Sequence, residues 1–143
     1  MKNELDQETK ARIRALRKFL KLSKKEEINQ GSQENEFEEG GRSYLVLLDD
    51  EADQVAQERI KESLWAFNAS FLASYTKLPQ KIFEALQKDG EGSNDTILQL
   101  IETQSNLEDF ANDAVSADGR GHFIASYDFD ENEEGIFYIY RTN

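Results

Sequence analysis

Short apolar runs typical of β-strands stand near both ends of this chain, and none occurs in the long middle section. The runs span residues 42–48, 122–127 and 136–141, and each is bounded by glycine-rich or acidic turn sequences. Aromatic and β-branched residues between such turn signals are typical of strands. We expect the three runs to share one antiparallel sheet. This predicts an α+β fold with about three to four strands packed on a layer of about four to five helices.

The spacing of the turns predicts two hairpins. Residues 36–38 lead through Glu39, Gly40 and Gly41 into the strand 42–48, and the run 122–127 is expected to pair with 136–141 across an acidic loop. Apolar residues recur with helical spacing elsewhere. The predicted helices span residues 5–22, 49–67, 68–75, a short segment after Pro79, 94–103 and 106–116.

The composition restricts the classes of site. The chain has 143 residues, enough for one domain with its own core, no cysteine and a single histidine. Thiolate or histidine-rich metal centres and disulfides are therefore not expected, and we predict no cofactor and no metal. No apolar run is long enough to cross a bilayer, and the N-terminal sequence lacks the pattern of a signal peptide. We expect a cytoplasmic protein that does not contact membranes.

Charge is distributed unevenly along the chain. Residues 1–25 hold nine basic and three acidic residues, net +6, whereas residues 26–143 hold eight basic and 26 acidic residues, net −18. The predicted organisation is a basic N-terminal helix (1–25), a linker (26–35) and an acidic α+β domain (36–143). The acidic domain should repel nucleic acid and attract basic proteins, so direct nucleic-acid binding is expected only through residues 10–25. The sequence leaves open whether the basic helix docks on the acidic domain, and it does not indicate the oligomeric state.

Two acidic clusters are the candidate partner-binding surface. Glu34, Glu36 and Glu38 alternate along a predicted strand at spacings of about 6.6 Å, close to the spacing of phosphates along a nucleic-acid strand. The second cluster lies on the predicted loop of the C-terminal hairpin. The candidate residues are Glu34, Glu36, Glu38, Glu39, Asp130, Glu131, Glu133 and Glu134. The alternative is that these acids only keep the protein soluble.

The segment Ala117-Asp118-Gly119-Arg120-Gly121-His122 holds the only histidine. Its glycines permit positive φ, and Asp118 can bond to the backbone of its own turn. We predict a structural turn in which Asp118, Arg120 and His122 are held together. The alternative is a hydrolase-like centre of His122 and Asp118 with Ser116 or Ser126, which lacks a nucleophile-elbow sequence.

Asp128, Asp130 and Asn132 begin like a calcium-binding loop. Glu133 and Ile139 occupy the positions where an EF-hand needs glycine and a bidentate glutamate, so that motif is excluded. Asp50 to Asp53 spells a helicase tetrapeptide, but the chain has no phosphate-binding glycine-rich loop. Asp49 or Asp50 is instead expected to cap the following helix.

Residues 11–143 resemble small, mostly uncharacterised acidic proteins encoded by bacteriophages and other mobile elements. The resemblance rests on residues 15–20, 44–47, 63–68, 117–123 and 137–141. It implies a phage protein acting inside a bacterial host cell, and by analogy an inhibitor of the anti-CRISPR or antirestriction type. It assigns no catalytic residues.

Together these observations favour a non-enzymatic interaction protein. The partner would be a basic host protein, a nucleic-acid-binding defence effector whose phosphate sites the acidic surface occupies. The alternatives are the small enzyme centred on His122 and Asp118, and a nucleic-acid binder that uses the basic helix.

Overall fold

A computed structural model describes residues 6–143, which form two compact units. Unit 1 comprises the chain up to Gln54 together with Arg120–Asn143, and unit 2 comprises Val55–Gly119. The chain passes from one unit to the other within helix α2 (Asp49–Glu62) and again after helix α6 (Leu107–Asp118). These crossings lie at positions where the sequence analysis placed no boundary.

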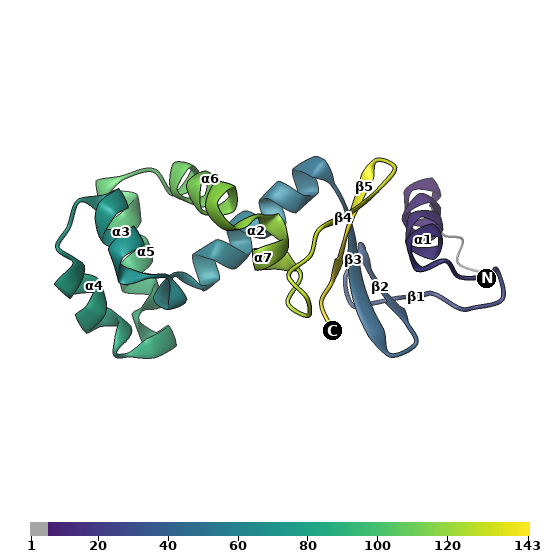
Figure 1. Cartoon of the computed structure of the whole chain (residues 1–143), viewed down its shortest axis with the longest axis horizontal. Helices are drawn as coiled ribbons and strands as arrows, with labels where there is room; N and C mark the ends of the chain where they lie inside the picture. Colours follow the sequence, from purple (N-terminus) through teal and green to yellow (C-terminus); the bar gives the residue numbers. More distant parts are fainter. Residues whose placement is uncertain (1–5) are drawn as a thin grey trace. The chain divides into compact units, whose positions relative to one another are not determined.

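Unit 1 is built on an antiparallel sheet with the strand order β1-β2-β3-β5-β4 (Figure 1). Its strands are β1 (Asn29–Gln30), β2 (Glu36–Glu39), β3 (Arg42–Leu48), β4 (Asn132–Glu134) and β5 (Phe137–Arg141). The central pair has Tyr44 opposite Arg141 and Leu48 opposite Phe137. The α+β class is confirmed, and the expected strands 42–48 and 136–141 do share the sheet. Residues 29–30, expected in a linker, form its edge strand instead.

Helix α1 (Gln7–Leu20) packs on this sheet (Figure 1). Leu16 meets Phe37, Val46 and Ile139 in a core that water does not reach, and all four side chains are 0% exposed. Burying each such side chain stabilises the fold by roughly 1.5–3 kcal/mol. The basic helix is therefore part of unit 1, where it packs on the sheet, a point that the sequence left open.

The prediction of a strand at 122–127 is wrong. Residues Arg120–Ile124 form the short helix α7, and the partner of β5 is β4, which lies inside the expected acidic loop. Short apolar runs do not distinguish a strand from a buried helical turn. Here the backbone decides, because Gly119 has a φ of +87° at the end of α6 and directs the chain into a new helical turn.

Unit 2 is helical. Beyond the second part of α2 it contains two short 3₁₀ turns, η1 (Leu64–Ala66) and η2 (Gly90–Ser93), and four helices: α3 (Ala69–Thr76), α4 (Gln80–Gln87), α5 (Asn94–Gln104) and α6. The expected helix 49–67 ends at Glu62 and continues only as η1. The helices predicted at 68–75, 94–103 and 106–116 are present with ends shifted by one or two residues.

Aromatic rings fill the interior of unit 2. The ring of Phe110 from α6 lies 5.4 Å from Phe67, 5.2 Å from Phe71 and 5.1 Å from Tyr75, measured between centroids. Asn94 ties η1 to α5, since its side chain accepts from the Trp65 N–H at 3.1 Å and donates to the Lys61 carbonyl at 2.7 Å. These contacts leave the charged side chains of unit 2 on its outer surface.

Candidate functional site

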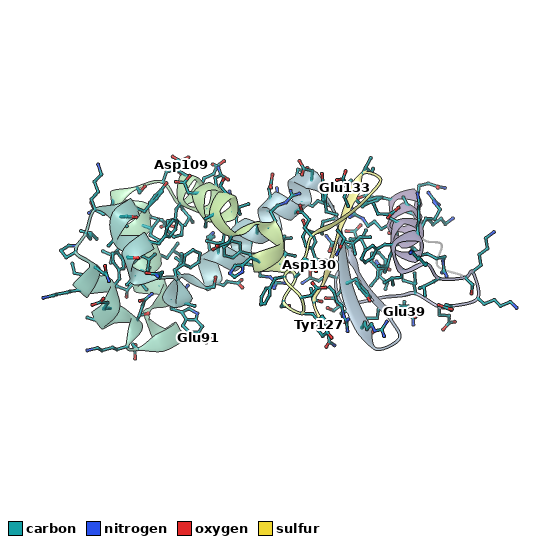
Figure 2. The ribbon with its side chains drawn as sticks, viewed as in Figure 1. Glu39, Glu91, Asp109, Tyr127, Asp130 and Glu133 are labelled. Carbon is teal, nitrogen blue, oxygen red and sulfur yellow. The ribbon has the colours of Figure 1, made fainter. Side chains whose placement is uncertain are left out.

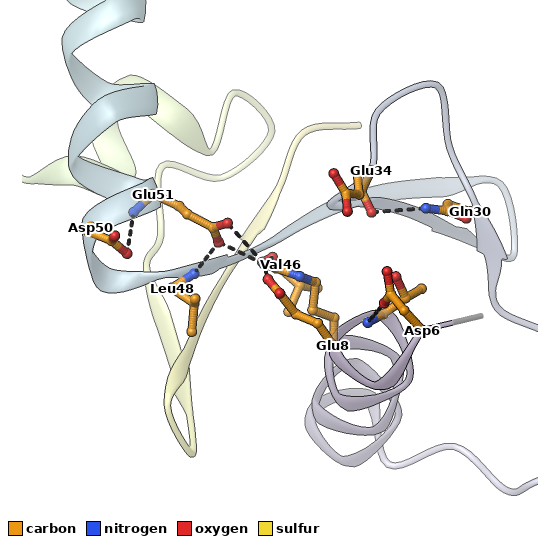
Figure 3. A network of polar contacts seen from close by, with 10 residues as sticks. Asp6, Glu8, Gln30, Glu34, Val46, Leu48, Asp50 and Glu51 are labelled. Atoms are coloured by element: carbon orange, nitrogen blue, oxygen red, sulfur yellow. Dashed lines mark hydrogen bonds and ion pairs between the residues drawn. The ribbon is translucent and has the colours of Figure 1, made fainter.

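The glutamates expected on one strand do not form a free row. Glu34 lies in the turn before β2, where its carbonyl accepts a hydrogen bond from the Gln30 side chain at 3.1 Å (Figure 3). The Glu36 carboxylate accepts from the backbone N–H and the hydroxyl of Ser32, at 3.1 and 3.2 Å. Glu38 is exposed, and Glu39 is half-buried opposite Arg42. Of this cluster, Glu36 is engaged in holding the turn.

The C-terminal acids are divided in the same way. Asp130 and Glu133 are exposed (Figure 2). Glu134 forms an ion pair with Lys18 at 3.4 Å, which links β4 to α1. Glu131 accepts hydrogen bonds from the Arg120 Nε at 2.7 Å and from the Tyr140 hydroxyl. The actual hairpin turn lies at Gly135 and Ile136, so Asp130 and Glu131 are not at a hairpin tip.

Arg120 is the centre of one carboxylate network in unit 1. Its Nη1 lies 2.8 Å from the Asp49 carboxylate and 3.1 Å from Asp53, and its Nε binds Glu131. The guanidinium also lies over the Tyr138 ring, 4.6 Å from the centroid. Burial by itself disfavours the charged guanidinium, but the hydrogen bonds to Glu131 and Asp49 outweigh it and raise the pKa of Arg120.

Tyr140 extends this network into the interior. Its side chain is fully buried, and its hydroxyl donates to Glu131. Burial first, and then this hydrogen bond, raise the pKa of the Tyr140 phenol above its usual range. Of the predicted turn residues, Arg120 thus has a structural role, through carboxylates that are distant in the sequence.

Arg12 is the centre of a second network that the sequence analysis missed. Its side chain is only 4% exposed, and it forms a two-point contact with Glu51 at 2.8 and 2.9 Å. It also donates to the Val46 carbonyl at 2.5 Å and to Glu8. Burial alone would lower the pKa of Arg12, but these carboxylates raise it overall.

The partner of Arg12, Glu51, lies in the first turn of α2. One of its oxygens also accepts from the Leu48 N–H at 2.8 Å, which is the bond that the third residue of a helix makes in a capping box, and the Asp50 carboxylate accepts from the Glu51 N–H at 3.0 Å. Burial acts to raise the pKa of Glu51, whereas the hydrogen bonds from Arg12 and Leu48 outweigh it and lower the pKa. The available signal was that Arg12 precedes the apolar Leu16 by four residues and so shares its face of α1, but only the fold shows that Arg12 faces inward.

His122 lies in α7 and has aromatic neighbours. Its ring stacks on Phe129 at 5.4 Å with an interplanar angle of 29° and meets Phe123 edge-on at 4.9 Å. Asp118 is exposed at the end of α6. A nucleophile relay requires hydrogen bonds between base, orienting carboxylate and hydroxyl, and the contacts of His122 are of a different kind.

The longest stretch of the chain without a basic residue lies in unit 2, where the sequence analysis placed no candidate site. Residues 89–119 contain eight acids and no lysine, arginine or histidine. All eight are exposed, and none forms an ion pair with any residue between 6 and 143 (Figure 2, Glu91 and Asp109). They are Asp89, Glu91, Asp95, Glu102, Glu108, Asp109, Asp113 and Asp118. The absence of basic residues over this stretch is visible in the sequence and was the signal to follow. We call these eight residues the acidic stretch of unit 2.

Two of these acids occupy positions that disfavour the helix. Glu102 lies in the last turn of α5 and Asp118 is the last residue of α6, where the helix dipole is negative and a carboxylate is disfavoured. Neither helix has a basic residue in its last turn. Asp95, Glu108 and Asp109 lie in first turns, where a carboxylate is favourable. Helix stability therefore explains some residues of the acidic stretch and not the others.

Comparisons with known proteins return no relative. No family model, no curated protein and no solved structure matches the chain. Within residues 6–143, no helix has the length and apolar character needed to cross a membrane.

Proposed function

We propose that this chain is a non-enzymatic interaction protein that binds a basic protein surface through the acidic stretch of unit 2. The observation that carries the proposal is the set of eight exposed carboxylates on residues 89–119, which have no basic residue among them and form no ion pair with any residue from 6 to 143. Carboxylates that form no ion pair within residues 6–143 remain able to bind the basic side chains of a partner. Long-range attraction to lysine and arginine would speed association.

The class of partner follows from the charge and from the resemblance noted above. A surface that places carboxylates where phosphates would lie competes for sites that bind nucleic acid. We propose a nucleic-acid-binding defence effector of a bacterial host as the target, and inhibition by occupation of its phosphate-binding residues. Glu38, Asp130 and Glu133, which are exposed in unit 1, would add to the attraction without forming its centre.

The test is competition with DNA for such an effector. We expect rising concentrations of the protein to displace labelled DNA from an RNA-guided nuclease, measured by fluorescence anisotropy. Displacement should weaken as salt rises, because the Debye length falls from about 10 Å at 0.1 M to about 3 Å at 1 M. Displacement that ignores salt would contradict an electrostatic mechanism.

Matched variants locate the surface. The unit 2 triple variant, Glu102→Gln with Asp113→Asn and Asp118→Asn, should weaken displacement at least tenfold. The unit 1 triple variant, Glu27→Gln with Glu34→Gln and Glu38→Gln, removes the same charge from exposed positions and should change it less than threefold. Equal losses would mean that only net charge matters, and a larger loss in the unit 1 variant would return the site to the glutamates near β2.

A further inference from the structure

Unit 1 leaves three large apolar side chains in contact with water. Tyr127 is 56% exposed, Phe129 is 58% exposed and Ile136 is 70% exposed. They gather in two patches separated by the short strand β4. Single exposed apolar residues are common on protein surfaces, so what distinguishes these is how their surroundings hold them.

The first patch is the loop of residues 125–130, here called the aromatic loop. Three hydrogen bonds fix it: the Phe129 N–H to the Ala125 carbonyl at 2.7 Å, Tyr127 to Arg141 at 3.2 Å, and the Asp130 N–H to the Asp128 carboxylate at 3.1 Å. The loop is therefore ordered before it meets any partner.

The backbone at Phe129 is held in an unfavourable conformation. Its φ is +62°, in the left-handed region that costs a bulky residue about 1–3 kcal/mol. Gly121 makes this possible, because a Cβ there would lie 2.5 Å from the Phe129 carbonyl oxygen. The ring that this conformation presents is exposed, stacked on His122, and flanked in the sequence by the exposed Asp128 and Asp130. A preordered aromatic side chain is the usual anchor of a protein contact.

The second patch is a groove between α1 and the β4–β5 turn, with a volume of about 230 Å³. A cavity of about 150 Å³ takes up a benzene molecule, so the groove has room for a phenylalanine ring. Its apolar lining comes from alanines of α1 and from the turn, and its polar lining is mainly basic. The residues are Ala11, Arg14, Ala15, Lys18, Glu134, Gly135, Ile136 and Phe137.

The charges of the two patches are complementary. Arg14 is exposed, and within residues 6–143 it has no ion pair or hydrogen bond. Lys18 is 80% exposed and pairs only loosely with Glu134, at 3.4 Å. The groove thus carries a net charge of +1, and the aromatic loop carries −2 from Asp128 and Asp130. Opposite charges of this kind favour one register of contact over others.

We propose that the aromatic loop of one copy of this chain binds in the groove of a second copy. Phe129 lies against Ala11, Ala15 and Ile136 of the other copy, and its flanking aspartates face Arg14 and Lys18. One contact then covers both patches. A two-fold pair makes the contact twice and closes as a dimer, whereas a head-to-tail arrangement continues into larger assemblies. The inference concerns unit 1 only and does not depend on the proposed function.

Sedimentation velocity of the full chain tests this proposal. The concentration should range from micromolar to near-millimolar, because a contact between one loop and one groove is small and small interfaces are weak. We expect a dimer or larger species whose fraction rises with concentration. Phe129→Gly should weaken association at least tenfold and keep the fold, since glycine suits the positive φ. The matched control Ile82→Ser changes an exposed apolar residue of unit 2 and should associate like the unmodified chain.

Charge exchange gives the second readout. Arg14→Glu and Asp130→Lys should each be weaker in self-association, and a mixture of the two variants should associate more strongly than either alone. A chain that stays monomeric at every concentration would overturn the proposal, and so would association that Phe129→Gly leaves unchanged. Weakened single variants without recovery in the mixture would mean that the loop and the groove do not meet.

Discussion

Unit 1 holds 18 acidic and 12 basic residues, and unit 2 holds 11 acidic and five basic residues, so each carries a net charge of −6. In unit 1, two arginines gather five carboxylates: Arg12 binds Glu8 and Glu51, and Arg120 binds Asp49, Asp53 and Glu131. Unit 2 has a single ion pair among the described residues, a long one between Lys61 and Glu58 at 3.9 Å. The comparison teaches that net charge does not show which acids are available, because inward-facing arginines decide it.

The largest effect should follow from removing the buried arginine of unit 1. Arg12→Met leaves Glu51 and the Val46 carbonyl without their partner, and breaking a buried charge network is costly. We expect a loss of about 2–3 kcal/mol in the free energy of unfolding of unit 1, below the range for fully buried pairs because Glu8 and Glu51 are partly exposed. Hydrogen exchange measured by mass spectrometry should be faster in the variant than in the unmodified chain, and this increase should be larger in β3 than in α5.

The control for this variant is Arg14→Met, which changes an exposed arginine of the same helix and should alter stability by less than about 0.5 kcal/mol. If the two variants lost equal stability, helix propensity and not the carboxylate network would be responsible.

A smaller effect is expected at the second network. Arg120→Met should cost about 1–2 kcal/mol, since Asp49 and Asp53 are 71% and 65% exposed and water compensates them. Urea unfolding followed by tyrosine absorbance reports on it, because Tyr138 and Tyr140 both contact this network. A loss above that of Arg12→Met would mean that the interior Tyr140–Glu131 contact depends on Arg120 more than the exposure of its partners indicates.

The strands were predictable where aromatic and β-branched residues were continuous. Residues 42–48 and 137–141 combine high strand propensity with burial, so pattern and packing agree. Strand β4, with the sequence Asn-Glu-Glu, gives no such signal, and it exists because it pairs along the edge of β5. Charged residues are common on edge strands because they prevent further pairing. The acidic sequence of β4 fits an edge strand, but it looks the same as an acidic loop and was interpreted as one.

The candidate site was less predictable than the fold. Arg120 and Asp49 are separated by 71 residues, and no local pattern shows that they meet. Glu131 and Glu134 therefore looked as available as Glu133, although both pair within unit 1. The acids of residues 89–119 also needed the structure, since a basic residue distant in the sequence could have paired with them, and none between residues 6 and 143 does.

Low pH should reduce the stability of unit 1 more than that of unit 2. The pKa of Glu51 is lowered in the folded state, so its contribution to stability is complete above the unfolded value of about 4.3 and is lost as the pH falls through the folded pKa. Unit 1 should therefore lose stability below about pH 4.3, by less than Arg12→Met costs. Hydrogen exchange at pH values on both sides of this point, corrected for intrinsic rates, should show the loss in β3 and not in α5. Parallel loss in both units would contradict this difference.

The smallest effect belongs to unit 2. The triple variant Glu102→Gln, Asp113→Asn and Asp118→Asn removes three charges without removing an ion pair, and two of these acids oppose a helix dipole. We expect a change within about 0.5 kcal/mol, toward higher stability, followed by Trp65 fluorescence, which reports on unit 2. The matched triple of unit 1, Asp49→Asn with Asp53→Asn and Glu131→Gln, removes equal charge from the Arg120 network and should lower stability by about 1–2 kcal/mol. A substantial loss in the unit 2 triple would show that its acids support the fold, and they would then no longer be free for a partner.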